Sequence, residues 1–210
     1  MMRTSLSKAY SSSAMFSVLP GHVHGVDTLE KTLSWQEKFI QNNAKVSKLG
    51  IMIRGDHGSA VDETEKSLCV QSSQKYSLGI APDSEYIMLI DAGAVLHPSA
   101  LYAIQKKILD HPGVDIFYSH EWQQTGSAKY LVRKPLVNRY SLLGRPTVGS
   151  FVVVKSKFIE PNQDITIYSP SEIALMTLAK GGIPKRIGLY LVTAQAQSYY
   201  SEHFSEIASK

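Results

Sequence analysis

The chain has 210 residues, of which 43% are hydrophobic and 19% are charged, a composition typical of a globular protein and not of a disordered one. Its length suits one sizeable domain, and its single cysteine excludes an internal disulfide and a cysteine-based zinc cluster. The net charge of +4 comes from scattered basic residues, which favours weak attraction to anionic partners and lacks the dense basic stripe of a nucleic-acid-binding protein.

The chain shows no apolar run as long as a membrane span. Residues 1–13 are polar and rich in serine, without the apolar core of a secretory signal, and are expected to form a flexible end. Residues 14–210 are then expected to form a single domain. We expect a cytoplasmic protein whose contact with a membrane, if it has one, is peripheral.

Predicted strands and helices alternate through the first part of the chain. The first helix begins with a capping box, in which Asp27 is the N-cap and Glu30 follows three residues later. In chain order the predicted elements are a strand at 14–19, that helix, a strand at 49–53, a short strand at 66–70 and a short helix at 74–80.

The apolar run at 86–90 is typical of a strand that is buried on both faces, as in the middle of a parallel sheet. It ends at Asp91. A carboxylate at the carboxyl end of such a strand lies where open α/β sheets bind their ligands. Pro98 then suits the first position of a helix, because its missing N–H costs no hydrogen bond there.

The second part of the chain continues with less regular alternation. The predicted elements are a helix at 98–109, a strand at 114–118, a strand at 150–154, a helix at 171–180 and a strand at 187–192. The whole pattern predicts an α/β fold with a mostly parallel sheet covered by helices on both faces, and the later strands favour an added antiparallel edge.

These segments, in this order from residue 15 to 192, resemble the family 2 glycosyltransferases, which have the GT-A fold. Residues 17–33 resemble the opening strand and helix, and residues 52–59 resemble a second strand that ends in Asp-Asp-Gly-Ser. Residues 86–101 resemble the segment Tyr-Ile-x-x-x-Asp-Ala-Asp-Asp-x-x-x-Pro-x-x-Leu. Residues 115–121, followed by Lys134-Pro135, resemble a block of the rhamnosyltransferase-like branch.

The resemblance implies transfer of a sugar from a nucleotide-sugar to an acceptor hydroxyl of a saccharide or glycoconjugate. It also implies a divalent cation, Mn²⁺ or Mg²⁺, which neutralises the diphosphate. Gly93 stands where the family has its main metal-binding aspartate, so the Asp-x-Asp motif is degenerate. Carried over, the roles are nucleotide binding for Pro20, Asp56 and Asp91, metal binding for Asp91, the general base for Glu172, and acceptor-side or loop roles for His120 and Glu121.

Each of these acids also has a structural interpretation. Asp91 suits a cap for the turn after it, and Asp56 suits a cap for the turn at Gly58-Ser59. Glu172 falls in the first turn of a helix, where an acid is favourable without any catalytic role. Glu121 suits a solvated loop.

Two further sets of residues suggest a replacement for the lost aspartate. Histidines follow several predicted strand ends, at His22, His24, His57 and His120, and together with carboxylates they are candidate ligands of a transition metal. Arg133-Lys134 is a candidate cation for the diphosphate, because a cationic side chain can take the place of a metal there. A solvated basic turn is the alternative for this pair.

Two functions follow. The first is an inverting hexosyltransferase of surface polysaccharide or glycoconjugate synthesis, with Glu172 as the base. The second is a non-catalytic glycosyltransferase-like domain that acts as a binding module or joins a protein partner. Gly93 favours the second function, as does Ile173-Ala174, which stands where the family has Tyr-Asp.

Overall fold

The structure is a computed structural model that describes residues 48–55, 58–144, 147–161 and 163–195. The predicted flexible end at 1–13, the strand at 14–19 and the capping box of Asp27 and Glu30 lie outside the described residues. The division of the chain into a flexible end and a single domain therefore stays a prediction.

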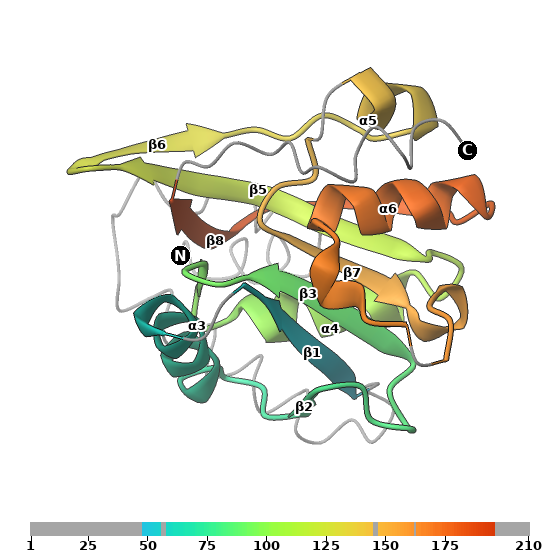
Figure 1. Cartoon of the computed structure of the whole chain (residues 1–210), viewed down its shortest axis with the longest axis horizontal. Coiled ribbons are helices and arrows are strands. Elements are labelled where there is room, and N and C mark those ends of the chain that lie inside the picture. Colours follow the sequence, from blue (N-terminus) through green and yellow to red (C-terminus); the bar gives the residue numbers. More distant parts are fainter. Residues whose placement is uncertain (1–47, 56–57, 145–146, 162, 196–210) are drawn as a thin grey trace, which may run out of the picture.

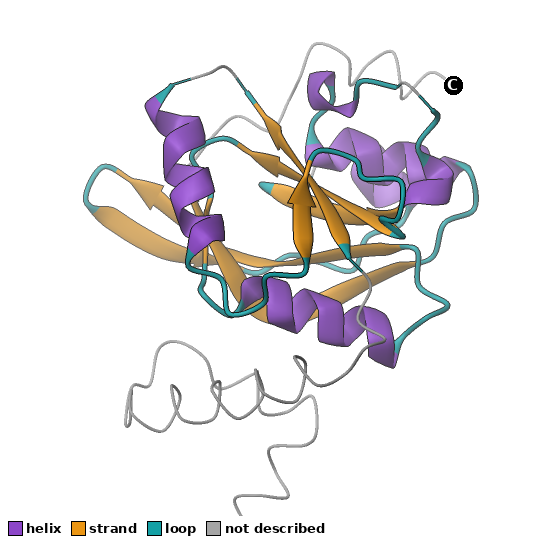
Figure 2. Cartoon of the chain, turned by 90° about the horizontal axis from the view of Figure 1, so that it is seen from below, coloured by secondary structure: helices purple, strands orange, loops and turns teal. Residues whose placement is uncertain are grey.

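The described residues form one eight-stranded sheet with helices packed against it (Figures 1 and 2). The strand order is β2-β1-β3-β7-β5-β8-β4, and β6 pairs with β5 outside that path. The strands are β1 (Leu49–Arg54), β2 (Tyr76–Leu78), β3 (Tyr86–Asp91), β4 (Val95–Leu96), β5 (Ile116–Thr125), β6 (Ala128–Val132), β7 (Phe151–Lys155) and β8 (Pro184–Gln195). The helices are α3 (Ser59–Cys69), α4 (Ala100–Asp110), α5 (Arg139–Gly144) and α6 (Pro170–Ala179), with short 3-10 turns η2 (Ser156–Phe158) and η3 (Ile165–Ile167).

The predicted α/β fold is confirmed, and its sheet is mixed. β1 runs parallel to β2 and β3, and β5 runs parallel to β8. The antiparallel strand is not confined to an edge, because β7 lies between β3 and β5 and is antiparallel to both. β7 begins beside the carboxyl end of β3, where Phe151 pairs with Ile90, so it has to run in the opposite direction. A strand was predicted at 66–70, between β1 and β3 in the chain, but β1 and β3 pair directly and no strand lies between them in the sheet.

The core has two parts, one on each face of the sheet. On one face, Tyr86, Met88 and Ile90 of β3 belong to a cluster that includes the α4 residues. On the other face, Ile87 and Leu89 belong to a cluster that includes the α6 residues. Every residue of β3 is buried, which confirms the prediction of a strand that is covered on both sides. α6 lies in front of the sheet in Figure 1 and α4 lies behind it.

Two short predictions in the first half were wrong. The strand predicted at 66–70 is largely the end of α3, whose buried residues Thr64, Ser67 and Leu68 recur at helical spacing. The helix predicted at 74–80 contains β2, because pairing with β1 supplies backbone hydrogen bonds that override the local preference. The helix predicted at 98–109 is present as α4, with Leu101, Ile104 and Ile108 buried, but it begins after its N-cap Ser99, so Pro98 precedes the helix and does not hold its first position. None of the described helices is long and apolar enough to cross a membrane.

β5 runs well beyond the predicted end of the strand at residue 118. It continues through residues 119–125, of which 119–124 pair with β8, and its last part forms a hairpin with β6 that was not predicted from the sequence. The pairing with β8 is irregular on both sides of His120. This extension turns the predicted loop at 119–121 into strand and brings two predicted site residues, His120 and Glu121, into the sheet.

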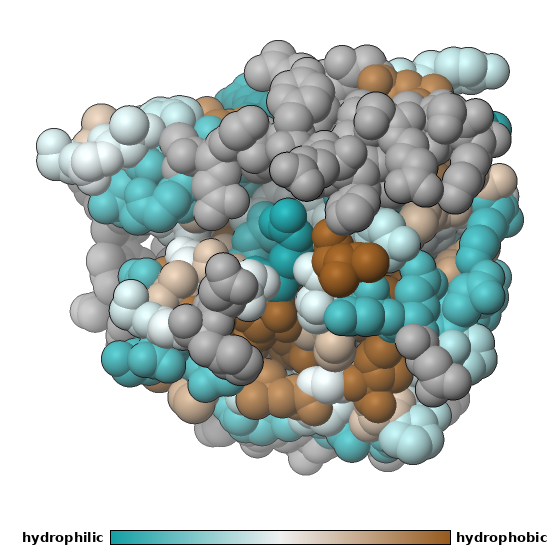
Figure 3. Space-filling model, in the orientation of Figure 1, coloured by the Kyte–Doolittle hydropathy of each residue, from teal (hydrophilic) through white to brown (hydrophobic). Residues whose placement is uncertain are grey.

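Apolar surface gathers in the lower centre of the face shown in Figure 3, over the region of β1 and β2. Leu78 in β2 and Ile80 just after it are among the exposed large apolar side chains. β2 ends the strand order of the described sheet, so its outer side has no neighbouring strand among the described residues. This part of the sheet edge lies away from the strand ends that carry the candidate site.

Candidate functional site

The candidate site lies at the carboxyl ends of β1 and β3, where Arg54 and Asp91 are register partners. Arg54 Nη1 donates a hydrogen bond to Asp91 Oδ1 over 3.0 Å, and the two form an ion pair. Asp91 is 8% exposed. Beside it is a hollow of about 10 Å³, lined also by Gly93, Ser150 and Gln195. That volume suits one water molecule or a small ion and not a nucleotide, which would have to lie outside it.

Burial raises the pKa of Asp91 to about 6, because removal from water penalises the carboxylate more than the neighbouring Arg54 guanidinium stabilises it. The charge of Glu121 adds to the increase. Asp91 is therefore ionised and paired at neutral pH and takes up a proton under mildly acidic conditions.

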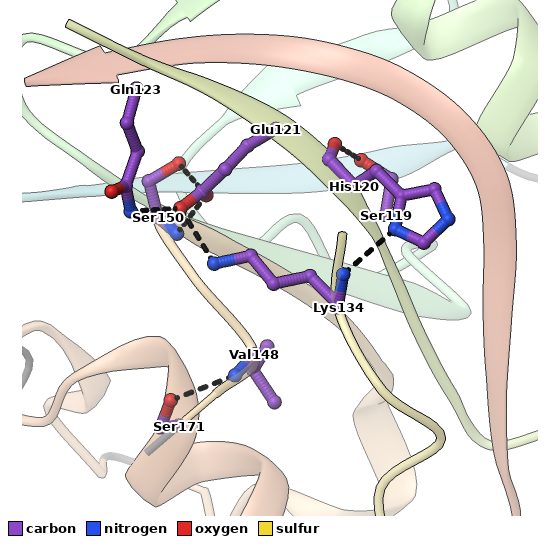
Figure 4. A network of polar contacts seen from close by, with 8 residues as sticks. All are labelled: Ser119, His120, Glu121, Gln123, Lys134, Val148, Ser150 and Ser171. Carbon is purple, nitrogen blue, oxygen red and sulfur yellow. Dashed lines mark hydrogen bonds and ion pairs between the residues drawn. The ribbon is translucent and has the colours of Figure 1, made fainter. Parts of the chain in front are cut away.

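Glu121 is the centre of a buried polar network (Figure 4). Its Oε1 accepts hydrogen bonds from Lys134 Nζ at 2.6 Å and from Gln123 Nε2 at 2.8 Å. Its Oε2 accepts from the Ser150 backbone N–H at 3.0 Å and from Ser150 Oγ at 3.1 Å. The side chains of Glu121 and Lys134 are only 1% and 3% exposed. The interpretation of Glu121 as a solvated loop acid was wrong, and so was that of Lys134 as part of a solvated basic turn.

Ser150 connects this network to Asp91. Its N–H and hydroxyl bind Glu121, and its carbonyl oxygen accepts a hydrogen bond from the Asp91 backbone N–H at 2.8 Å. Gly149, the residue before it, has φ +101°, which favours glycine. A Cβ at this position would overlap Glu121 Oε2 and lie 2.9 Å from Lys134 Nζ. The close approach of the backbone to this ion pair therefore requires a glycine.

His120 lies beside the network and is neutral. Burial, followed by the charges of Arg186, Arg133 and Lys134, lowers the pKa of its imidazole to about 4. Its Nδ1 accepts a hydrogen bond from the Lys134 backbone N–H at 2.9 Å, so the ring proton is on Nε2. Its ring lies 5.2 Å from that of Tyr190, measured between centroids.

The transition-metal hypothesis finds no support within the part of the chain that the structure describes. His22, His24 and His57 lie outside that part. His120 uses Nδ1 to accept a backbone hydrogen bond. No group of three or more histidine, cysteine, aspartate or glutamate side chains able to hold a metal occurs among the described residues.

Glu172 lies at the start of α6 and has no exposed surface. Its Oε2 accepts a hydrogen bond from the Ser169 N–H at 2.6 Å, while Ser169 Oγ accepts one from the Glu172 N–H, which together form a capping box. The structural interpretation of this acid is confirmed. In this arrangement the carboxylate is directed to its own helix and is not open to an acceptor hydroxyl, which argues against the predicted role of general base.

The remaining predicted site residues are placed unevenly. Pro20 and Asp56 lie outside the described residues, so their nucleotide-binding roles stay predictions. Arg133 Nε donates a hydrogen bond to the Tyr190 hydroxyl at 3.3 Å, and Arg133 is not the residue that pairs with Asp91. The cation that does meet Asp91 is Arg54, which the sequence analysis did not select. Arg54 directly follows the strand predicted at 49–53, and this position at a strand end is the signal in the sequence that could have identified it.

A second hollow of about 500 Å³ lies further along the β4–β8 pair. We call it the aromatic groove, and it is lined by Val95, Leu96, His97, Pro98, Trp122, Lys129, Tyr190, Val192 and Thr193. The rings of Trp122 and Tyr190 have centroids 5.9 Å apart, and Lys129 Nζ lies 5.5 Å from the centroid of the Trp122 ring. No local signal in the sequence points to this groove, because a hairpin and a long final strand bring its residues together.

The two hollows are close neighbours along the same pair of strands. Ala94 and Ala194 line the hollow beside Asp91. The adjacent residues Val95 and Thr193, which are register partners, line the aromatic groove. A ligand at Asp91 and a ligand in the groove would therefore lie next to each other along this pair of strands.

No family model and no curated protein matches the sequence. Among solved structures, S. aureus TarS 1–349 matches with a TM-score of 0.50 and 10% identity, over 70% of this chain and 60% of that chain. The same fragment in complex with UDP-GlcNAc matches with a TM-score of 0.51 and 11% identity, over 75% of this chain and 60% of that chain. A structure of S. aureus TarS matches with a TM-score of 0.50 and 13% identity, over 76% of this chain and 38% of that chain.

At such identities the likeness shows the fold alone, and the matched region covers about 60% of the length of TarS 1–349. It does not distinguish the rhamnosyltransferase-like branch, which stays a prediction. The chain has a mixed α/β fold with a curled central sheet, and this fold is the GT-A-like fold that S. aureus TarS shares.

Proposed function

We propose that the chain binds a nucleotide-sugar across the carboxyl ends of β1 and β3 and transfers the sugar to an acceptor hydroxyl. The observation that carries this proposal is the buried Asp91 carboxylate, which is paired with Arg54 at the ligand-binding edge of the sheet. Buried carboxylates with strongly raised pKa values concentrate at functional sites. A UDP-sugar is the first donor to test, since a TarS structure that shares the fold holds UDP-GlcNAc.

The aromatic groove supports a saccharide as the acceptor. The faces of aromatic rings pack well against the C–H faces of sugar rings, and both Trp122 and Tyr190 line this groove. The groove adjoins the hollow beside Asp91 along β4 and β8, so a bound acceptor would lie next to the donor. Synthesis of a surface polysaccharide or glycoconjugate, in the cytoplasm or at the membrane surface, is the cellular role that we propose.

A non-catalytic binding domain is the second candidate, and the positions of the predicted acids favour it. Glu172 caps α6, Glu121 is held by Lys134 and Ser150, and Asp91 is paired with Arg54. None of these three offers an unengaged carboxylate to an acceptor hydroxyl. Such a domain would bind the nucleotide-sugar and serve a protein partner without transferring the sugar.

The test is a thermal-shift screen of UDP-, GDP- and dTDP-sugars, each with Mn²⁺ and with EDTA, followed by a turnover assay of nucleotide release. A ligand that binds only the native state must raise its apparent stability. We expect one donor class to raise the melting temperature in wild type, and less in Asp91→Ala. Binding with turnover supports the transferase, binding without turnover supports the second candidate, and no shift with any donor contradicts both.

A further inference from the structure

The side chains around Asp91 do not fit a divalent cation. Mg²⁺ needs several oxygen ligands, of which a protein usually supplies one or two carboxylates, while waters and substrate phosphates supply the others. Asp91 contributes the only carboxylate among the residues lining the described hollow, and Gly93 has no side chain to add. Glu121, the acid whose charge acts on Asp91, already accepts hydrogen bonds on both of its oxygens.

A positive charge is already present at this carboxylate. Arg54 Nη1 lies 3.0 Å from Asp91 Oδ1, so a divalent cation on Asp91 would have to share it with a guanidinium. Like charges at such short separation repel strongly in a partly buried site. The geometry therefore favours the guanidinium over a metal ion as the charge that Asp91 holds in place.

Arg54 also remains accessible to a ligand. Its side chain is 28% exposed, in contrast to the 3% of Lys134, the cation that the sequence analysis proposed for the diphosphate. A guanidinium has N–H donors in a planar fork, and the bond to Asp91 uses Nη1. The other donors suit phosphate oxygens, which arginine binds in a bidentate manner.

The first turn of α3 adds a second favourable feature at this position. The backbone N–H of Gly93 donates to the Ala60 carbonyl oxygen at 2.8 Å, which places the start of α3 against the turn that follows Asp91. The N-cap of α3 is Gly58, which provides no side-chain cap. Backbone N–H groups at a helix N-terminus favour phosphate, and this helix begins beside the turn that follows Asp91.

We propose that Arg54, held by Asp91, binds the diphosphate of the donor in place of a divalent cation, so that nucleotide binding by this chain is independent of metal. The inference rests on the proposed function, because it assigns the charge that binds the donor at the same site. It also replaces the expectation of a Mn²⁺ or Mg²⁺ cofactor for this chain.

The test is the affinity for UDP by isothermal titration calorimetry, in EDTA and in Mn²⁺, with the full chain. We expect the dissociation constant of the wild type to agree within about twofold between the two conditions. Arg54→Ala should weaken UDP binding about tenfold or more, as expected for the loss of a charge-assisted hydrogen bond. Arg139→Ala is the matched control, because it removes an exposed arginine at the start of α5, and it should not change the affinity.

Arg54→Ala leaves Asp91 without its partner, so Arg54→Ala/Asp91→Asn serves as the second variant, with folding verified by circular dichroism. It should show the same loss of UDP affinity. UDP binding that requires Mn²⁺, or that is unchanged in both Arg54 variants, overturns the inference and leaves the proposed function intact. No UDP binding to the wild type in either condition, while another donor class binds independently of Arg54, also overturns the inference. Failure of every donor class overturns the proposed function and the inference together.

Discussion

Gly149 lies against the buried ion pair of Glu121 and Lys134 and has φ +101°, in the region that favours glycine. A side chain there would strain the left-handed backbone, at a cost of about 1–2 kcal/mol. It would also displace a buried ion pair, and separating the two partners of such a pair is strongly destabilising. We expect Gly149→Ala to lower the free energy of unfolding by about 3 kcal/mol, measured by urea denaturation.

Gly126→Ala is the matched control for this variant. Gly126 also has a positive φ, +57°, but a Cβ there would meet nothing within 4 Å. The control should therefore show the backbone cost alone, about 1 kcal/mol. Equal losses in the two variants would mean that the ion pair does not constrain Gly149.

Asp91 should make stability depend on pH in the direction opposite to most carboxylates. Burial raises its pKa from 3.8 to about 6 in the folded state, so the folded protein binds this proton more tightly than the unfolded chain does. The resulting stabilisation is largest below pH 4 and is lost as pH rises through 6. Between pH 4.5 and 7.5 the loss amounts to about 2 kcal/mol.

The measurement compares the wild type with Asp91→Asn, which cannot titrate, by urea denaturation across that pH range. The difference in unfolding free energy, wild type minus variant, should fall by about 2 kcal/mol from pH 4.5 to 7.5. A difference that stays constant with pH would show that the pKa of Asp91 is the same in the folded and unfolded states.

Helix α6 is held at its first turn by contacts on two sides. The capping box of Ser169 and Glu172 satisfies backbone N–H groups of the helix itself. The neighbouring Ser171 Oγ accepts a hydrogen bond from the Val148 N–H, next to Gly149 (Figure 4). The start of α6 is thereby joined to the segment that leads into Ser150 and the Glu121 network.

This arrangement separates the two roles considered for Glu172. Glutamine also serves at the third position of a capping box, so Glu172→Gln should change the unfolding free energy by less than about 0.5 kcal/mol, whereas Glu172→Ala should cost about 1 kcal/mol. A glutamine cannot act as a base, and removal of a general base typically costs about 10²-fold or more in rate.

Because the carboxylate caps the helix, we expect Glu172→Gln to retain the transfer rate of the wild type in an assay of nucleotide release. Circular dichroism melting of the same samples verifies the fold. A rate loss of about 10²-fold with unchanged melting temperature would establish Glu172 as the base and reject the purely structural role.

Features that depend on local pattern could be predicted from the sequence, whereas those that depend on pairing between distant segments could not. The apolar run before Asp91 is enough to predict a buried strand and a carboxylate at its end. Whether Glu121 is solvated or buried depends on Lys134 and Ser150, which β6 and β7 bring to it. The partnership of Arg54 and Asp91 likewise depends on the register of β1 and β3, which no single segment contains.

The arrangement of the two hollows around β4 and β8 leads to a prediction about the acceptor. Trp122 lines the aromatic groove and does not line the hollow beside Asp91. The chain has two tryptophans, so in a Trp35→Phe background the fluorescence reports Trp122 alone. We expect oligosaccharides from a panel of neutral and uronic-acid-containing saccharides to change this emission. In a separate measurement by calorimetry, Trp122→Ala in the otherwise natural protein should weaken their binding about tenfold.

Two comparisons make this prediction specific to the groove. Trp122→Ala should leave the affinity for UDP unchanged, because Trp122 lines the groove and not the hollow beside Asp91. Tyr130→Ala removes an aromatic side chain that is 43% exposed on the same hairpin and does not line the groove, so saccharide binding should persist in that variant. Equal losses in both variants would indicate nonspecific contact with the hairpin surface, and a loss of UDP affinity in Trp122→Ala would place the donor, not the acceptor, in the aromatic groove.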